Sequence, residues 1–133
     1  MARRVLAWWR DALRLHGWRV NLAWNEDRAW DYFGTVVRSA GRPEATVTLW
    51  SYLPDAETME RTCLHELIHL VLMPMTTLAE QWRDSIPEDV RPIYDAQWTE
   101  VIEQTTDHIT MAFDGLLGGL AIAEAADAVG VDE

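Results

Sequence analysis

The chain of 133 residues contains no lysine, so all eleven of its basic side chains are arginines. Its single cysteine, Cys63, excludes a framework of intramolecular disulfides. The longest nearly uncharged stretch near the end, GLLGGLAIA, is too short to cross a bilayer. Arg10, Asp11 and Arg14 interrupt any apolar core of a signal peptide near the start. These absences lead us to expect a cytoplasmic protein with no membrane partner.

Apolar residues make up 49% of the sequence, which is typical of a globular chain. The length predicts one domain over residues 1–133 with a modest core. Four of the eight tryptophans lie in patterned segments, where we expect them to pack in the core: Trp8, Trp18, Trp24 and Trp50.

Charge is distributed unevenly along the chain. Residues 1–42 carry eight arginines and four acids, whereas the remainder carries three arginines and eighteen acids. Because no nucleic-acid-binding motif accompanies the dispersed arginines, we expect the basic segment to dock on the acidic body. The net charge of −11 also opposes affinity for phosphate, so nucleic acid is not an expected partner.

The pattern of apolar residues changes from a helical to an alternating period and back. It predicts a helix over residues 2–16 ended by Gly17, and then strands at 18–24, 32–39 and 45–51. A second helix is predicted from its N-cap at Asp55 until Pro74 stops it, followed by irregular chain or a short helix over 75–88. A long helix is expected from about Asp89 to about Phe113, ended by Asp114 and Gly115, before a weak helix or partly ordered tail over 115–133. The fold class is therefore α+β, with a small antiparallel or mixed three-stranded sheet.

The second helix contains CLHELIHLVLMP, in which His65, Glu66 and His69 form the pattern His-Glu-x-x-His. Residues four apart share one helix face, so both imidazoles can bind one zinc ion. From the adjacent position Glu66 can take a proton from a zinc-bound water as general base. The helix is apolar almost all round, which predicts burial, and buried His and Glu side chains require partners that a metal supplies.

A catalytic zinc needs a third protein ligand and one open position. The long helix offers Glu103, with Asp107 on the same face to accept the other ring N–H of a ligand histidine. Glu100, one turn earlier, and His108 are alternative third ligands. Tyr94 and His108 are candidates for stabilising an oxyanion, although Tyr94 is equally explained as a packing residue near the helix start.

TCLHELIHLVLMP followed by a glutamate on a later helix resembles the small gluzincin-type zinc metallopeptidases. It is particularly similar to the minimal intracellular zincins of the ImmA/IrrE and SprT-like sort, many of which are carried by bacteriophages and mobile elements. The resemblance covers about residues 45–113 and implies a zincin-like fold. It also implies that His65, His69 and Glu103 bind zinc, that Glu66 is the general base, and that strand 45–51 lies along the cleft.

These features predict a zinc-dependent peptidase that acts on a peptide or protein substrate. Two alternatives remain open at this point: a catalytically silent zincin that keeps a structural metal and binds a partner, and a metal-free interaction module. The residues after Glu103 also depart from the apolar pattern of the family, with Thr106, Ile109 and Thr110 in its place.

Overall fold

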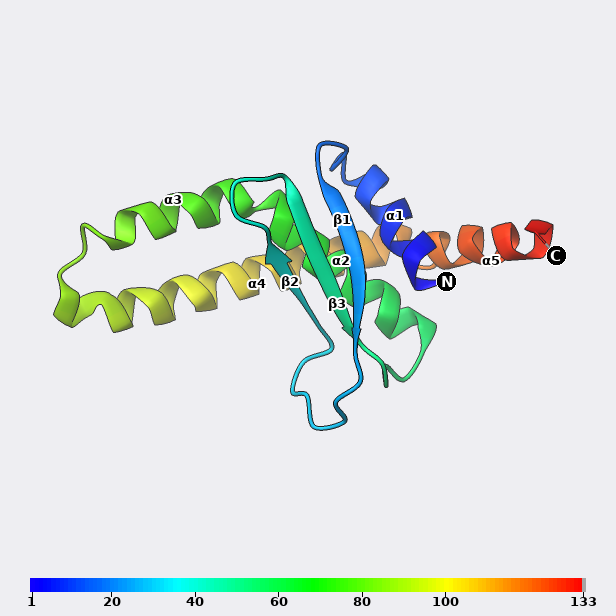
Figure 1. The fold of residues 1–133 in the computed structure, drawn as a ribbon, viewed down its shortest axis with the longest axis horizontal. Coiled ribbons are helices and arrows are strands. Elements are labelled where there is room, and N and C mark those ends of the chain that lie inside the picture. The colour runs from blue at the N-terminus through cyan, green and yellow to red at the C-terminus, as the bar shows by residue number, and fades with distance from the viewer. Residues whose placement is uncertain (133) are drawn as a thin grey trace.

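The computed structural model describes residues 1–132, with side chains through residue 128. In chain order the elements are α1 (Ala2–Ala12), β1 (Arg19–Asn25), β2 (Gly34–Arg38), β3 (Glu44–Trp50), α2 (Ala56–Val71), α3 (Met73–Arg83), the 3₁₀ turn η1 (Glu88–Val90), α4 (Arg91–Leu117) and α5 (Leu120–Asp132). Helices and a small three-stranded sheet confirm the α+β class (Figure 1). Glu133, the end of the expected tail, lies outside the described residues.

The sheet is mixed, with the strand order β1-β3-β2. β3 lies in the centre, parallel to β1 and antiparallel to β2. Its side chains alternate as the sequence predicts, and Ala45, Val47 and Leu49 are fully buried against the helices. Because β3 is paired along both sides, only β1 and β2 offer free edges in this sheet.

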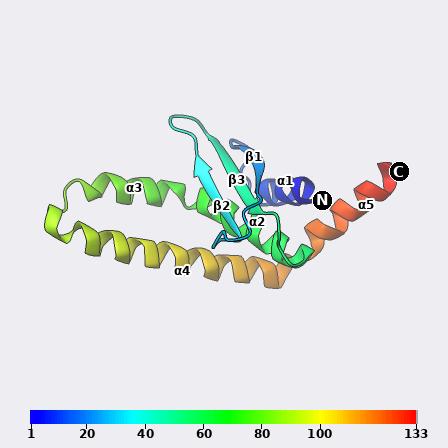
Figure 2. The same cartoon turned by 60° about the horizontal axis from the view of Figure 1, so that its bottom comes forward.

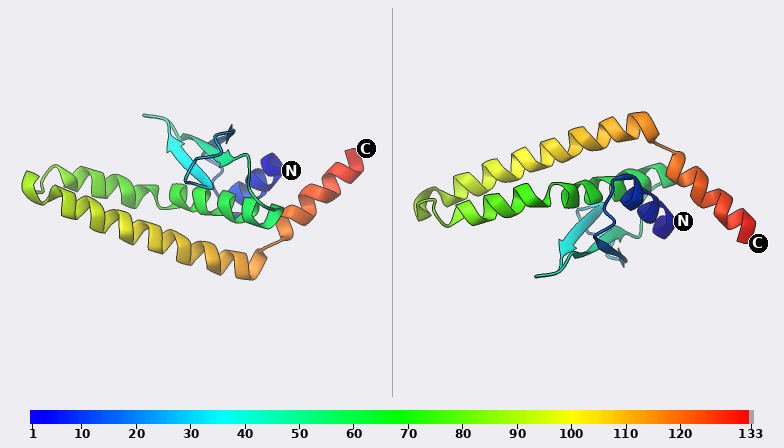
Figure 3. Two further views of the ribbon diagram at one scale, coloured as in Figure 1. Left: turned by 90° about the horizontal axis from the view of Figure 1, so that it is seen from below. Right: turned by 90° about the horizontal axis from the view of Figure 1, so that it is seen from above.

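α2 lies between two layers of the fold. The sheet crosses one side of α2, and α4 runs along the opposite side (Figure 3). α1 and α5 pack near the N-terminal half of α2, where Trp9 and Val5 are completely buried. The predicted burial of α2 is confirmed, since Cys63, Leu64 and Leu67 have no exposed surface.

α3 and α4 run side by side and project beyond the sheet as a helical hairpin, while α5 extends toward the other end (Figure 2). Near the tip of this hairpin, Arg83 donates two hydrogen bonds to Asp95 at 2.8 and 3.0 Å. The Tyr94 hydroxyl donates to the carbonyl oxygen of Ala79 at 2.6 Å. No single helix among residues 1–132 combines the length and the apolarity needed to cross a membrane.

The boundaries of α2 and α3 correct the expectation that Pro74 stops the helix. Asp55 is the N-cap as predicted, and its carboxylate accepts a hydrogen bond from the Thr58 amide at 2.7 Å. α2 ends at Val71, but α3 begins at Met73 after a bend of 55°. Pro74 lies in the first turn of α3, where a missing amide N–H costs no helical hydrogen bond. The expected irregular segment is therefore mostly helical.

Two further boundaries also differ from the expectation. α1 ends at Ala12, and the chain reverses at Arg14, which has φ 59°, rather than at Gly17. α4 continues through Asp114 and Gly115 to Leu117, and Gly118 then caps it by donating to the Asp114 carbonyl at 2.8 Å. The following residue, Gly119, has φ 92°, a backbone conformation that favours glycine.

Two of the four tryptophans expected in the core do not pack against it. Trp24 is 50% exposed and lies near the end of the edge strand β1. Trp8 and Trp18 are half-buried against the core, whereas Trp50 is half-buried outside it, in contact with Phe33 and Tyr52. The fully buried tryptophan is Trp9, on the inner face of α1.

Candidate metal centre

Two imidazoles project from the same face of α2. His65 and His69 are one helical turn apart, and their ring centroids are separated by 5.0 Å at an interplanar angle of 78°. Their side chains retain 21% and 18% of their exposure, so they are accessible from one side only. Burial lowers the pKa of His69, which favours the neutral imidazole that a metal requires.

α4 brings one carboxylate to both imidazoles. The Oε2 atom of Glu103 lies 3.5 Å from Nε2 of His65, and its Oε1 atom lies 3.2 Å from Nε2 of His69. The ligand atoms of these three residues all lie within 4.8 Å of one another. Among the residues with described side chains, this is the one group of histidine, cysteine and carboxylate side chains with that proximity.

Asp107, one turn after Glu103, lies at the other side of the His65 ring. Its Oδ1 atom is 3.1 Å from Nδ1 of His65. A proton on Nδ1 that is donated to Asp107 leaves a lone pair on Nε2, which then faces the Glu103 carboxylate. A cation or a proton between these two electron-rich atoms would stabilise the arrangement.

The donor set fits a divalent metal such as zinc. Tetrahedral zinc with bonds of 2.0–2.1 Å separates its ligand atoms by about 3.4 Å. The two contacts of Glu103 with the imidazoles, 3.5 and 3.2 Å, are close to this spacing. Two imidazoles and one carboxylate leave a fourth position for water or substrate. The His-His-Glu group can therefore hold a metal ion.

Glu66 lies beside this group but is held in a different environment. Its side chain is buried, with 6% of the residue surface exposed. Burial, and to a lesser extent the negative charge of Glu103, raises the pKa of Glu66 to about 7. A carboxylate with a pKa near neutrality can both accept and release a proton under physiological conditions.

A cleft of about 590 Å³ opens over these side chains. His65, Glu66, His69 and Glu103 form part of its wall, and Gly34, Thr35 and Val36 of β2 border it. The interpretation that strand 45–51 lies along the cleft is therefore wrong. That strand is β3, whose two edges are both paired, whereas β2 separates it from the cleft.

β2 presents unpaired backbone groups at its outer edge. The Trp50 amide donates to the Phe33 carbonyl at 2.8 Å, and the Ser39 amide donates to the Glu44 carbonyl at 2.9 Å. Backbone groups of successive residues point to opposite sides of a strand. The amides and carbonyls of Gly34 and Val36 therefore point away from β3, at the edge that borders the cleft.

The other residues singled out in the sequence lie outside the group. Glu100 is exposed on α4, and its carboxylate accepts a hydrogen bond from the side-chain amide (Nε2) of Gln104 at 3.2 Å. His108 is also exposed, and neither residue belongs to the cluster of potential ligands. Tyr94 packs between α3 and α4 through its bond to Ala79, so its hydroxyl is engaged away from the cleft.

The threonines that depart from the pattern of the family hold α4 against α2. Thr106 and Thr110 are buried, with 0% and 3% of their surface exposed. Their hydroxyls donate to the carbonyl oxygens of Ile102 and Thr106, each at 2.7 Å. Bonds of this kind satisfy the hydroxyl within its own helix, so the remaining methyl group packs as an apolar side chain. This buried face aims Glu103 and Asp107 toward α2.

Several cleft residues were not identified from the sequence. They come from β2 and its preceding loop, from α3 and from α4: Tyr32, Gly34, Thr35, Val36, Met73, Thr76 and Thr99. Gly34 carried the one local signal, since a glycine inside a strand indicates close approach of another backbone or element. A Cβ at Gly34 would lie 2.6 Å from Cγ2 of Thr62 on α2.

Scans against protein-family models, curated proteins and solved structures found no match to this chain.

Proposed function

We propose that the protein is a zinc-dependent peptidase of zincin-like architecture. The observation that carries the proposal is the convergence of His65, His69 and Glu103 beside the buried Glu66, in a cleft bordered by the free edge of β2. A structural zinc site uses four protein ligands, whereas three ligands facing a cleft are typical of a catalytic site.

The free edge of β2 supports the choice of a polypeptide substrate. An extended peptide can add to this edge by bonding to the backbone groups of Gly34 and Val36, which is a common mode of peptide recognition. The bound backbone would then pass over His65 and Glu66, because these residues line the same cleft as β2. A small-molecule substrate would make no use of such an edge.

Each residue has one role in the proposed reaction. Asp107 keeps the proton of His65 on Nδ1, and Glu103 supplies the negative charge that balances the metal. Zinc, when bound, polarises the scissile carbonyl and makes a water molecule acidic. Glu66 accepts the proton of the attacking water and then transfers it to the leaving amine.

Glu66→Gln tests this proposal, because it keeps the size of the side chain and removes the base. The protein is expected to contain about one zinc per chain and to cleave an unfolded protein or a fluorogenic peptide mixture. Glu66→Gln should retain the metal and lose about 10²- to 10⁴-fold in cleavage rate. Glu100→Gln, the same substitution on an exposed face of α4, is the matched control and should behave like the unmodified protein.

Two results would contradict the peptidase proposal. Cleavage that is unaffected by Glu66→Gln would show that another group, or a contaminant, provides the base. Stoichiometric zinc whose removal lowers the melting temperature, with no peptide cleaved in the mixture, would instead favour the catalytically silent, partner-binding alternative.

A further inference from the structure

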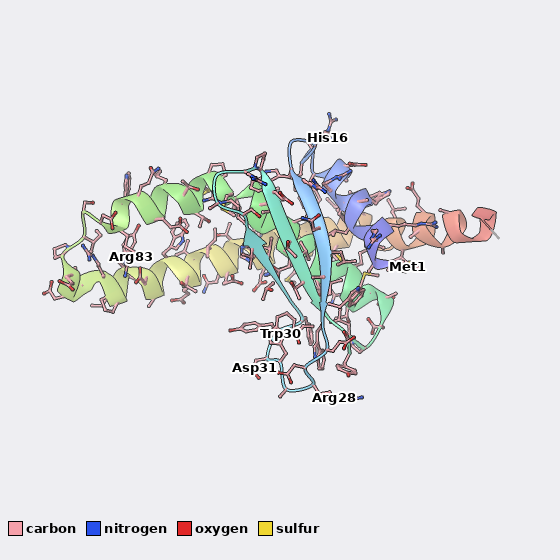
Figure 4. All side chains as sticks on the ribbon, in the orientation of Figure 1. Met1, His16, Arg28, Trp30, Asp31 and Arg83 are labelled. Carbon is pink, nitrogen blue, oxygen red and sulfur yellow. The ribbon has the colours of Figure 1, made fainter. Side chains whose placement is uncertain are left out.

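Aromatic side chains gather where the β1–β2 loop meets the segment after β3. Phe33 stacks on Trp50 with ring centroids 6.3 Å apart, and Trp50 contacts Tyr52 edge-on at 5.6 Å. The guanidinium of Arg28 lies 4.2 Å above the Tyr52 ring. Figure 4 shows Arg28, Trp30 and Asp31 on this loop, far from Arg83 at the tip of the hairpin.

This loop is held by specific contacts but leaves two rings open to solvent. The Trp50 indole N–H donates to the Asp27 carbonyl at 2.9 Å, and Trp30 packs edge-on against Tyr32 at 5.9 Å. Even so, 60% of Tyr32 and 54% of Phe33 remain exposed. Exposed aromatic side chains on an anchored loop indicate a binding surface. Burying such a ring is favourable, and here this free energy is gained only when a partner covers the ring.

Tyr32 and Phe33 form one wall of a second cavity, of about 390 Å³, which we call the aromatic pocket. Thr58 and Thr62 of α2 line the opposite wall. Tyr32, Gly34, His65 and Glu66 line both this pocket and the main cleft. The aromatic pocket is therefore the continuation of the cleft beyond the proposed base.

We propose that the aromatic pocket binds one aromatic or bulky apolar side chain of the polypeptide substrate, next to the bond that lies at Glu66. The inference rests on the proposed function of the cleft and names its preferred substrate. A strand paired with the outer edge of β2 passes Gly34, which lines both cavities. Every second side chain of that strand points toward α2, and one of them enters the pocket between Tyr32 and Thr62.

The charges around the pocket oppose an acidic occupant, and Arg61 opposes a basic one. Arg61 is already paired with Asp114 at 3.4 Å, so an acidic substrate side chain would compete for it while facing Asp31 and Glu66. A basic side chain would meet the like charge of Arg61, whereas Asp31, Glu66 and the two rings would attract it, so the Lys peptide tests this occupant directly. An apolar side chain neither competes with Asp114 for Arg61 nor brings a charge that must lose its hydration. Burying it favours binding in proportion to its apolar area.

The selectivity can be measured without turnover in zinc-loaded Glu66→Gln protein. Fluorescence anisotropy would give dissociation constants for labelled, unstructured peptides that differ at one position, scanned along the sequence, among Phe, Leu, Ala, Glu and Lys. Phe is expected to bind about 10- to 100-fold more tightly than Ala at a single position of the peptide. Adding Tyr32→Ala and Phe33→Ala should reduce this ratio to below about 3-fold, while the Ala peptide keeps its affinity.

Trp82→Ala is the control, because Trp82 is also a 60% exposed aromatic residue but lies on α3, outside both cavities. It should leave the Phe-to-Ala ratio unchanged. Tyr32→Ala alone preserves the stack of Phe33 on Trp50 and provides a milder variant, expected to lower the ratio several-fold.

The inference is overturned if Phe and Ala peptides bind equally, if Glu or Lys binds best, or if the preference survives in the double variant. Failure of the peptidase proposal is a separate result. Binding is compared in a protein that cannot turn over, so a selective pocket without hydrolysis by the unmodified chain would contradict the proposed reaction alone.

Discussion

Nδ1 of His65 lies 3.1 Å from Oδ1 of Asp107, while Nε2 of the same ring lies 3.5 Å from Oε2 of Glu103. Both acids come from α4, four residues apart, so one face of this helix contacts both nitrogens of a single imidazole. The arrangement fixes the orientation of the ring and directs its Nε2 lone pair toward the shared position of His69 and Glu103.

Replacing Asp107 with alanine should weaken zinc binding by about 10- to 100-fold, because the His65 ring loses the acceptor that fixes its tautomer. Competition with a chromogenic chelator would measure the change. His108→Ala is the control, since this exposed neighbour does not belong to the cluster and should leave the affinity unchanged. Equal affinities for Asp107→Ala and the unmodified chain would show that Asp107 does not act on the metal site.

The same substitution at Glu103 and at Glu100 can show which of the two is the third metal ligand. Glu103→Ala removes a ligand and should reduce zinc affinity by more than Asp107→Ala does, whereas Glu100→Ala should have no effect. Metal content after dialysis against a weak chelator, determined by mass spectrometry, would distinguish them. The assignment of the third ligand is wrong if Glu100→Ala loses the metal and Glu103→Ala retains it.

The parts of the site that could be predicted from the sequence depend on helical periodicity. A spacing of four residues places His65 above His69, and the same spacing places Glu103 above Asp107, whatever the rest of the fold does. The buried, apolar character of α2 follows from its sequence in the same way. These are local relationships, and the structure brings the two pairs together as α2 packs on α4.

The strand order and several boundaries could not be predicted, because they depend on contacts between distant segments. The order β1-β3-β2 places β2 at the cleft, although β3 has the stronger alternation. Gly115 has a weak helical propensity, yet it continues α4, because Phe113 and Leu117 on either side of it pack against the core. A proline such as Pro74 is found both just after the end of a helix and in the first turn of a helix. The sequence alone does not distinguish these two positions.

Glu60 should contribute strongly to stability, since it joins three parts of the fold. Its carboxylate is 2% exposed and accepts hydrogen bonds from the Trp9 indole at 3.1 Å and from the Gly119 amide at 3.2 Å. Glu60→Ala leaves both donors without an acceptor and should lower the free energy of unfolding by about 2–5 kcal/mol. Glu60→Gln keeps one acceptor oxygen and should cost less.

Urea denaturation would measure these differences. Glu80→Ala, at an exposed position of α3, should change the free energy of unfolding by less than about 0.5 kcal/mol. If Glu60→Ala is as stable as this control, the buried carboxylate does not hold α1 to the α4–α5 junction.

The tip of the helical hairpin should respond to pH through Asp95. Its hydrogen bonds with Arg83 hold the pKa of Asp95 below its ordinary value of about 3.9. Because the pKa is lower in the folded chain, the contribution of the pair is present above about pH 4 and is lost as the pH falls through the folded-state pKa. Carboxyl NMR titration should show Arg83→Gln raising the pKa of Asp95, with Arg42→Gln as the remote control. An ordinary pKa for Asp95 in the unmodified chain would contradict this prediction.

Gly34, the one glycine in the three strands, should not tolerate a side chain, because β2 lies against Thr62 of α2 there. A Cβ at this position would lie 2.6 Å from Cγ2 of Thr62 and 3.1 Å from the Thr48 carbonyl oxygen. Gly34→Ala should therefore lower the free energy of unfolding by about 1–3 kcal/mol and move β2 away from Glu66.

Thr62→Ser removes the clashing methyl group but keeps the hydroxyl that donates to the Thr58 carbonyl at 2.7 Å. Combining the two substitutions should restore part of the lost stability, since the shortest remaining contact is the one with the Thr48 carbonyl oxygen at 3.1 Å. Gly17→Ala, where a Cβ meets nothing within 4 Å, is the control and should be nearly neutral. Full additivity of Gly34→Ala and Thr62→Ser in urea denaturation would mean that the two side chains do not meet.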